Sequence, residues 1–214
     1  QHYVQLQAGL QLANRTGPIN DIEFSEYIVK TQAFADIISA QPDFPEMMTE
    51  VARARELDQF ASAHDAQLNF TIRADKAVWT VGYVQSHAAK MGFVPGSLPG
   101  KMVLQSTNGG VPILTLRFDS QAAMADDTEQ ASVHELRMEL DVTHVASQLN
   151  AYDRMRNTAI DLAAAIDGIL TDDSGARLTP EALNQIGQSV KSLYAELAAR
   201  DFPAGSPLAK RLFS

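Results

Sequence analysis

The segments ELRMELDV (residues 135–142) and YDRMRNTAIDLAAAIDGILTDDSGARLTPEALNQIGQ (residues 152–188) decide the fold of this chain. Apolar and polar residues alternate in the first segment, which is the period of a half-buried strand. The second segment predicts a helix over Tyr152–Ile166, a short strand over Gly168–Thr171 and a last helix that begins at Thr179-Pro180. The chain therefore closes with the order strand, helix, strand, helix.

The segments before residue 135 extend this pattern. Alternation predicts a strand over Leu68–Ile72, and helical spacing predicts a helix over Trp79–Met91. The apolar runs Lys101–Gln105 and Val111–Phe118 flank a Thr-Asn-Gly-Gly sequence, which predicts a hairpin. Residues 120–132 are polar and acidic and are predicted to form a surface loop. This order is typical of an α+β fold of split β-α-β type, with an antiparallel sheet and helices packed on one face.

Residues 1–65 are predicted to form an N-terminal extension to a core of residues 66–200. Val4–Leu12 alternates like a strand, and two helices follow it, over Phe24–Ile38 and Glu46–His64. The sequence Ala-x-Glu/Asp-Leu occurs in this extension and again in the core, so the extension is either a partial repeat of the core unit or an unrelated addition. Residues 201–214 form a tail whose apolar residues have helical spacing, and we expect it to dock on its own domain or on a neighbouring copy.

Composition excludes several classes of function. The chain has 214 residues, 17 basic and 26 acidic side chains and a net charge of −9, which argues against nucleic acid or an anionic membrane surface as the main partner. It has no cysteine, which excludes disulfides and thiolate catalysis. No apolar run approaches the length of a membrane helix, so we expect a soluble fragment, with any membrane anchor upstream of it.

Residues that could carry chemistry are few, and we predict no catalytic residue, metal site or cofactor. Asp172-Asp173 is an acidic pair that could hold a metal ion in a hydrolase, but with Ser174-Gly175 it is more typical of a turn. No phosphate-binding glycine loop is present, and the five histidines are scattered along the sequence. A small-molecule-binding regulatory module of ferredoxin-like shape is the alternative to a protein-binding domain.

Residues Arg137–Gln188 resemble the C-terminal domain of the ZipA family of bacterial division proteins. The resemblance lies in the alternating strand, the long helix, the short strand with its Asp-Asp turn, and the Thr-Pro start of the last helix. Upstream, the segments Leu68–Ile72 and Ala88–Phe93 fit the first strand and helix end of that family. The segments Ala13–Ser25 and Val51–Ala61 resemble a beta-proteobacterial branch.

This resemblance implies a non-enzymatic scaffold domain that binds the C-terminal tail of FtsZ and links the division ring to the inner membrane. It implies a location at the division septum, on the cytoplasmic face of that membrane, with no direct membrane contact from this fragment. In the family the peptide binds an open, apolar face of the sheet. Alternation predicts which residues here face outward from three strands, and they are our candidate peptide-binding residues: Asn69, Thr71, Thr115, Arg117, Arg137 and Glu139. Because these side chains are polar or charged, we expect more charge pairing with the peptide than the family's apolar groove would give.

Overall fold

The computed structural model describes residues 4–106, 111–125, 127 and 131–214. The chain divides into two compact units. The first comprises Gln1–Asp65 together with Lys210–Ser214, and the second comprises Ala66–Ala209. The Thr-Asn-Gly-Gly turn predicted at residues 107–110 lies outside the described residues.

A six-stranded antiparallel sheet forms the centre of the second unit, in the order β10-β3-β9-β7-β6-β5. The α+β class with an antiparallel sheet is therefore confirmed. The strand bounds are β3 Gln67–Ala74, β5 Val94–Pro95, β6 Lys101–Leu104, β7 Leu114–Arg117, β9 Glu135–Asp141 and β10 Gly168–Thr171.

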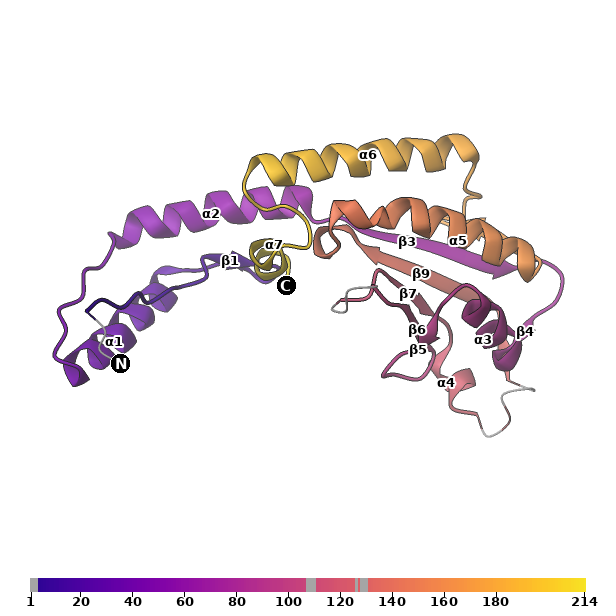
Figure 1. Ribbon diagram of the computed structural model, residues 1–214, viewed down its shortest axis with the longest axis horizontal. Helices are drawn as coiled ribbons and strands as arrows, with labels where there is room; N and C mark the ends of the chain where they lie inside the picture. The colour runs from indigo at the N-terminus through magenta and orange to yellow at the C-terminus, as the bar shows by residue number, and fades with distance from the viewer. Residues whose placement is uncertain (1–3, 107–110, 126, 128–130) are drawn as a thin grey trace. The chain divides into compact units, whose positions relative to one another are not determined.

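Two helices, α3 (Val81–Lys90) and α5 (Ala151–Ala165), cover one face of this sheet. Alternate residues of the strands point into that layer and are buried, as the period of two requires. The inward residues of the three central strands are Phe70, Ile72, Leu114, Leu116, Leu136, Met138 and Leu140. The last long helix, α6 (Pro180–Ala199), packs on α5, and Figure 1 shows both helices stacked along the same side of the sheet.

The starts of these helices follow from local sequence. Thr179 accepts a hydrogen bond from the backbone of Ala182 through Oγ1 at 3.2 Å, and Pro180 occupies the first turn of α6, as predicted. Asp119 caps a four-residue helix, α4 (Ser120–Ala123), in a stretch predicted to be a loop. That prediction was wrong there because the aspartate supplies acceptors to the free N–H groups of a first helical turn.

The predicted start of the helix at Trp79 was also wrong. Residues Trp79–Thr80 form β4, which pairs with β8 (Ser132–Val133), and the helix begins after them. The indole of Trp79 donates to the carbonyl of Ile166 at 2.6 Å, which satisfies its N–H in a buried position. Two 3-10 turns, η1 (Val142–His144) and η2 (Ser147–Leu149), connect β9 to α5.

Two helices and a small hairpin form the first unit. The hairpin joins β1 (Ala13–Asn14) to β2 (Gly17–Pro18), and the helices are α1 (Asp21–Ile37) and α2 (Met47–His64). Asn20 and Glu23 form a capping box at the start of α1. The guanidinium of Arg15 is paired with the carboxylate of Asp65 at 2.7 Å, so the hairpin is tied to the end of α2.

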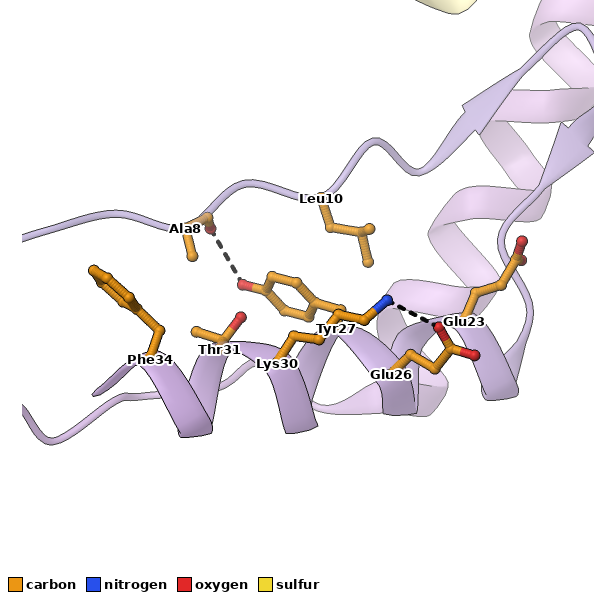
Figure 2. Close-up of a pocket in the computed structure, with 8 residues that line it drawn as sticks. All are labelled: Ala8, Leu10, Glu23, Glu26, Tyr27, Lys30, Thr31 and Phe34. Carbon is orange, nitrogen blue, oxygen red and sulfur yellow. Dashed lines mark hydrogen bonds and ion pairs between the residues drawn. The ribbon is translucent and has the colours of Figure 1, made fainter. Parts of the chain in front are cut away.

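The predicted opening strand at Val4–Leu12 is not formed. The segment runs along α1, where the hydroxyl of Tyr27 donates to the carbonyl of Ala8 at 3.2 Å and Leu10 points toward the same helix (Figure 2). A strand needs a neighbour to complete its backbone hydrogen bonds, and the described residues provide no ladder for this segment. Alternation in the sequence indicates which side of this segment is apolar, but it does not indicate whether another strand lies beside the segment.

The C-terminal tail forms a short helix, α7 (Pro207–Leu212). Leu212 and Phe213 are buried, while Leu208 is 52% exposed. The carbonyl of Ser214 accepts from the backbone of Arg15 at 3.0 Å, and these last residues therefore pack within the first unit. In the described part of the chain, no helix has the length and apolar character needed to cross a membrane.

Candidate peptide-binding face

The sheet of the second unit has an open face, which is the face turned away from α3 and α5. Strand register brings the six predicted residues together on it. Asn69 lies opposite Glu139, and Glu139 lies opposite Thr115, in one cross-strand row. The neighbouring row joins three others in the same way: Thr71, Arg137 and Arg117. Side chains that are directly opposite have Cβ atoms about 4.5–5.5 Å apart, so the six form one contiguous surface.

These six residues differ in how much of them a partner could reach. Arg117 and Arg137 are exposed, and Asn69, Thr115 and Glu139 are partly buried. Thr71 is only 3% exposed although it lies on the open face, between Arg137 of β9 and Thr171 of β10. Its hydroxyl is therefore a poor contact for a peptide.

Charged residues dominate the middle of this face. Arg117 Nε donates to Glu139 Oε2 at 2.7 Å, across β7 and β9. Toward the β10 side, Arg73 and Glu135 form a looser pair at 3.6 Å. Both pairs are substantially exposed, so each contributes about 1 kcal/mol or less to folding, and both remain available to exchange partners.

Sequence reasoning missed the residues that extend the face across β6 and β5. Lys101 lies opposite Arg117, and Val103 lies opposite Thr115. Val94 on β5 lies opposite Val103 and is 45% exposed. The predicted hairpin could have identified the residues on β6. Pairing its two strands around the turn determines which residues of each strand share a face. The open face therefore has a cationic middle and a small apolar edge.

The acidic pair at residues 172–173 forms the predicted turn. A carboxylate oxygen of Asp172 accepts from the backbone N–H groups of Ser174 and Ala176, both at 2.9 Å, and from the Ser174 hydroxyl at 2.6 Å. These hydrogen bonds lower the pKa of Asp172. Within the described ranges, no three histidine or carboxylate side chains gather as a metal-binding group.

A hollow of about 630 Å³ lies between α5, β10 and the start of α6. Apolar side chains such as Ile160 and Leu170 line it, with Arg156 and Asn184 among its polar residues. Its volume is within the range of small-molecule sites. It is separate from the six predicted peptide-binding residues.

Comparison with protein families identifies the matched part of the chain. Residues 119–189, about a third of the sequence, match the family model described as the ZipA C-terminal FtsZ-binding domain. The description of this family names FtsZ as the protein that its members bind. It covers β9 and therefore Arg137 and Glu139, whereas the other four predicted residues lie before it. A comparison with curated proteins found no match.

Proposed function

We propose that this chain, whose residues 119–189 match the ZipA C-terminal FtsZ-binding domain, binds the C-terminal tail of FtsZ on the open face of its sheet. The six predicted residues make up the site in this proposal; five of them contact the peptide, and the buried Thr71 supports its neighbours. The observation that carries the proposal is the register that gathers these six side chains on one face, opposite the helical layer.

The polarity of this face leads to a specific expectation about binding. Side chains that are charged and exposed contribute modestly, and salt screens their interactions. We therefore propose that Arg117 and Arg137 pair with acidic groups of the tail, while the exposed Val94 at the apolar edge takes an apolar side chain. Affinity should fall as the salt concentration rises.

A titration of the FtsZ tail tests the proposed surface. A peptide with the sequence of the C-terminal tail of FtsZ from the same organism would be added to isotopically labelled protein, and backbone amide shifts would be followed. Shifts that cluster on β3, β7 and β9, around Asn69, Thr115 and Arg137, support the proposal. Shifts confined to the hollow beside β10 would show that the peptide binds there instead. The absence of shifts at millimolar peptide would refute binding of the tail.

The cellular role proposed here has two further parts. The chain acts at the septum, on the cytoplasmic face of the inner membrane, where it links the division ring to that membrane. It represents a beta-proteobacterial type of the family, as Ala13–Ser25 and Val51–Ala61 suggest. A fluorescent fusion of the full-length protein should gather at the division site in dividing cells, and a uniform distribution would contradict this role.

A second candidate function rests on the hollow beside β10. Its volume of about 630 Å³ and its apolar lining suit a small ligand. A thermal-shift screen with metabolites tests this candidate. A ligand that raises Tm in the unchanged protein and loses its effect in an Ile160→Trp variant would support a regulatory small-molecule site.

A further inference from the structure

Three basic side chains form a continuous row across the open face. Lys101 on β6 lies opposite Arg117 on β7, and Arg117 lies opposite Arg137 on β9. We call these three residues the cationic row. Neutral threonines continue the same line, Thr71 on β3 and Thr171 on β10. The row is therefore confined to three neighbouring strands, across about 10 Å at the usual strand spacing.

Such a row is unfavourable for the isolated sheet. Like charges that lie directly opposite one another on paired strands are destabilising. The chain as a whole is strongly acidic, with 26 acidic against 17 basic side chains, so a local row of cations is not a consequence of composition. An arrangement that weakens the fold and opposes the general charge indicates a partner that neutralises it.

Acidic side chains of the protein neutralise only part of the row. Glu139 is paired with Arg117 at 2.7 Å. Among the ion pairs of the described residues, none involves Lys101 or Arg137. Glu139 thus neutralises Arg117, the middle member of the row, and the cations on either side of Arg117 have no acidic partner among the described residues.

We propose that the cationic row binds carboxylate side chains of an acidic peptide segment, and that Glu139 stands in for one of those carboxylates while the peptide is absent. This inference rests on the proposed function, in which the peptide is the tail of FtsZ. A guanidinium forms charge-assisted hydrogen bonds with a carboxylate in a planar geometry, and Arg117 already shows this chemistry with Glu139. A polyanion such as nucleic acid fits less well, because the net charge of −9 would repel phosphates beyond the row.

Charge-neutralising variants of the row test the proposal. Lys101→Gln and Arg137→Gln should each weaken binding of the FtsZ tail about two- to fivefold, the range expected for an exposed ion pair. Arg73→Gln is the matched control, because Arg73 lies on the same face, outside the row, and is already paired with Glu135. Its effect should be smaller than that of either row variant.

The stand-in role of Glu139 makes an opposite prediction. Glu139→Gln should tighten binding about two- to fivefold, because the peptide no longer competes for Arg117. Glu135→Gln removes the same charge from the same face of the same strand, but from the pair with Arg73. It therefore controls for the change in electrostatic potential over the face that follows from losing one negative charge. Equal effects of the two substitutions would overturn the stand-in role.

A stability measurement separates binding from structural damage. Because Arg137 faces Arg117, Arg137→Gln should leave Tm unchanged or raise it while affinity falls. A decrease in both Tm and affinity would show that Arg137 supports the fold rather than the partner, and would overturn its assigned role.

Two probes distinguish failure of this inference from failure of the proposed function. If the FtsZ tail binds but the row variants leave its affinity unchanged, the row is not the site and tail binding stands. If the tail does not bind but a hexaglutamate peptide does, and loses affinity in Lys101→Gln and Arg137→Gln, the row stands and the proposed partner fails. Binding of neither peptide overturns both, as does row-dependent binding to phosphatidylglycerol vesicles in place of either peptide.

Discussion

At the scale of single residues, Asp172 shows how one side chain organises a turn. Its carboxylate accepts hydrogen bonds from the residues that follow it, chiefly from Ser174, and these bonds hold the pKa of Asp172 below its usual range. A carboxyl whose pKa is lower in the folded state stabilises the fold at pH values above the unfolded pKa, near 3.9, and loses this contribution as the pH falls through the folded value.

We predict that Asp172→Asn lowers Tm at pH 7, and that the difference from the unchanged protein shrinks as the pH falls below about 3.9. Thermal unfolding followed by circular dichroism across this range would measure both. Asp173→Asn is the matched control, since its exposed carboxylate makes no such hydrogen bonds in the described structure, and it should change Tm less. Equal losses in the two variants would contradict the account of the turn.

Two tyrosines of the second unit differ in how their hydroxyls are satisfied. Tyr152 donates to the carbonyl of Leu183, in a buried bond between α5 and α6. The hydroxyl of Tyr194 is buried and, among the described residues, has no hydrogen-bond partner. Burial raises the pKa of Tyr194 to about 12. A buried hydroxyl without a partner costs free energy, whereas a bonded one contributes to stability.

We predict that Tyr194→Phe raises the free energy of unfolding by about 1 kcal/mol and that Tyr152→Phe lowers it by about 1 kcal/mol. Because burial makes the pKa of Tyr194 higher in the folded state than in the unfolded state, folding opposes ionisation of this hydroxyl, and stability falls as the pH rises from about 10 toward 12. Tyr194→Phe should therefore lose less stability over that range. Urea unfolding at pH 7 and pH 11 would check these signs, and a destabilised Tyr194→Phe variant would show that the hydroxyl has a partner.

At the scale of elements, the contact between α5 and α6 depends on a glycine. A Cβ atom on Gly187 would lie 2.9 Å from Cε1 of Tyr152, which is closer than packed side chains approach. In an isolated helix, alanine is better than glycine by roughly 0.5–1 kcal/mol. Here the contact between helices reverses that preference, because α5 can move away only by opening the buried layer.

We predict that Gly187→Ala lowers the free energy of unfolding by about 1–3 kcal/mol. Ser189→Ala, at an exposed position of the same helix, should be neutral or slightly stabilising because alanine favours a helix more than serine does. Denaturant unfolding of both variants would give the comparison. A stabilised Gly187→Ala would show that helix propensity outweighs the contact with Tyr152.

The periodicity of the sequence predicts some secondary-structure elements of this protein correctly and others wrongly. The strand and helices of residues 135–188 form where alternation and helical spacing place them, to within a few residues. Val4–Leu12 has an equally clear alternation but forms no strand in the described structure. The difference is physical: a helix completes its hydrogen bonds within its own segment, while a strand depends on a neighbour that its own sequence does not specify.

At the scale of the whole molecule, the proposed binding face belongs to one compact unit. Every residue of the open face lies within Ala66–Ala209, and the buried cluster behind it is drawn from the same range. The first unit has its own contacts, including the pairing of Arg15 with Asp65. Binding of the tail should therefore depend on the second unit.

We predict that a chain of residues 66–209 folds and binds the FtsZ tail within about twofold of the affinity of the full chain, since no contact residue is lost. Circular dichroism would establish folding, and isothermal titration would give the affinity. Arg137→Gln in the shortened chain is the control, and it should weaken binding as in the full chain. A folded fragment that fails to bind would place part of the site in the first unit.

The sequence by itself determined the α+β class, the order of elements in the second unit and the six side chains that face away from its helices, because these depend on periodicity along a single segment. Tertiary structure decided the rest. Only the pairing of β6, β7 and β9 brings Lys101 beside Arg117 and Arg137, since register depends on which strands become neighbours. Only packing buries Thr71 and leaves residues 4–12 without a strand partner among the described residues, because both outcomes depend on segments distant in the sequence.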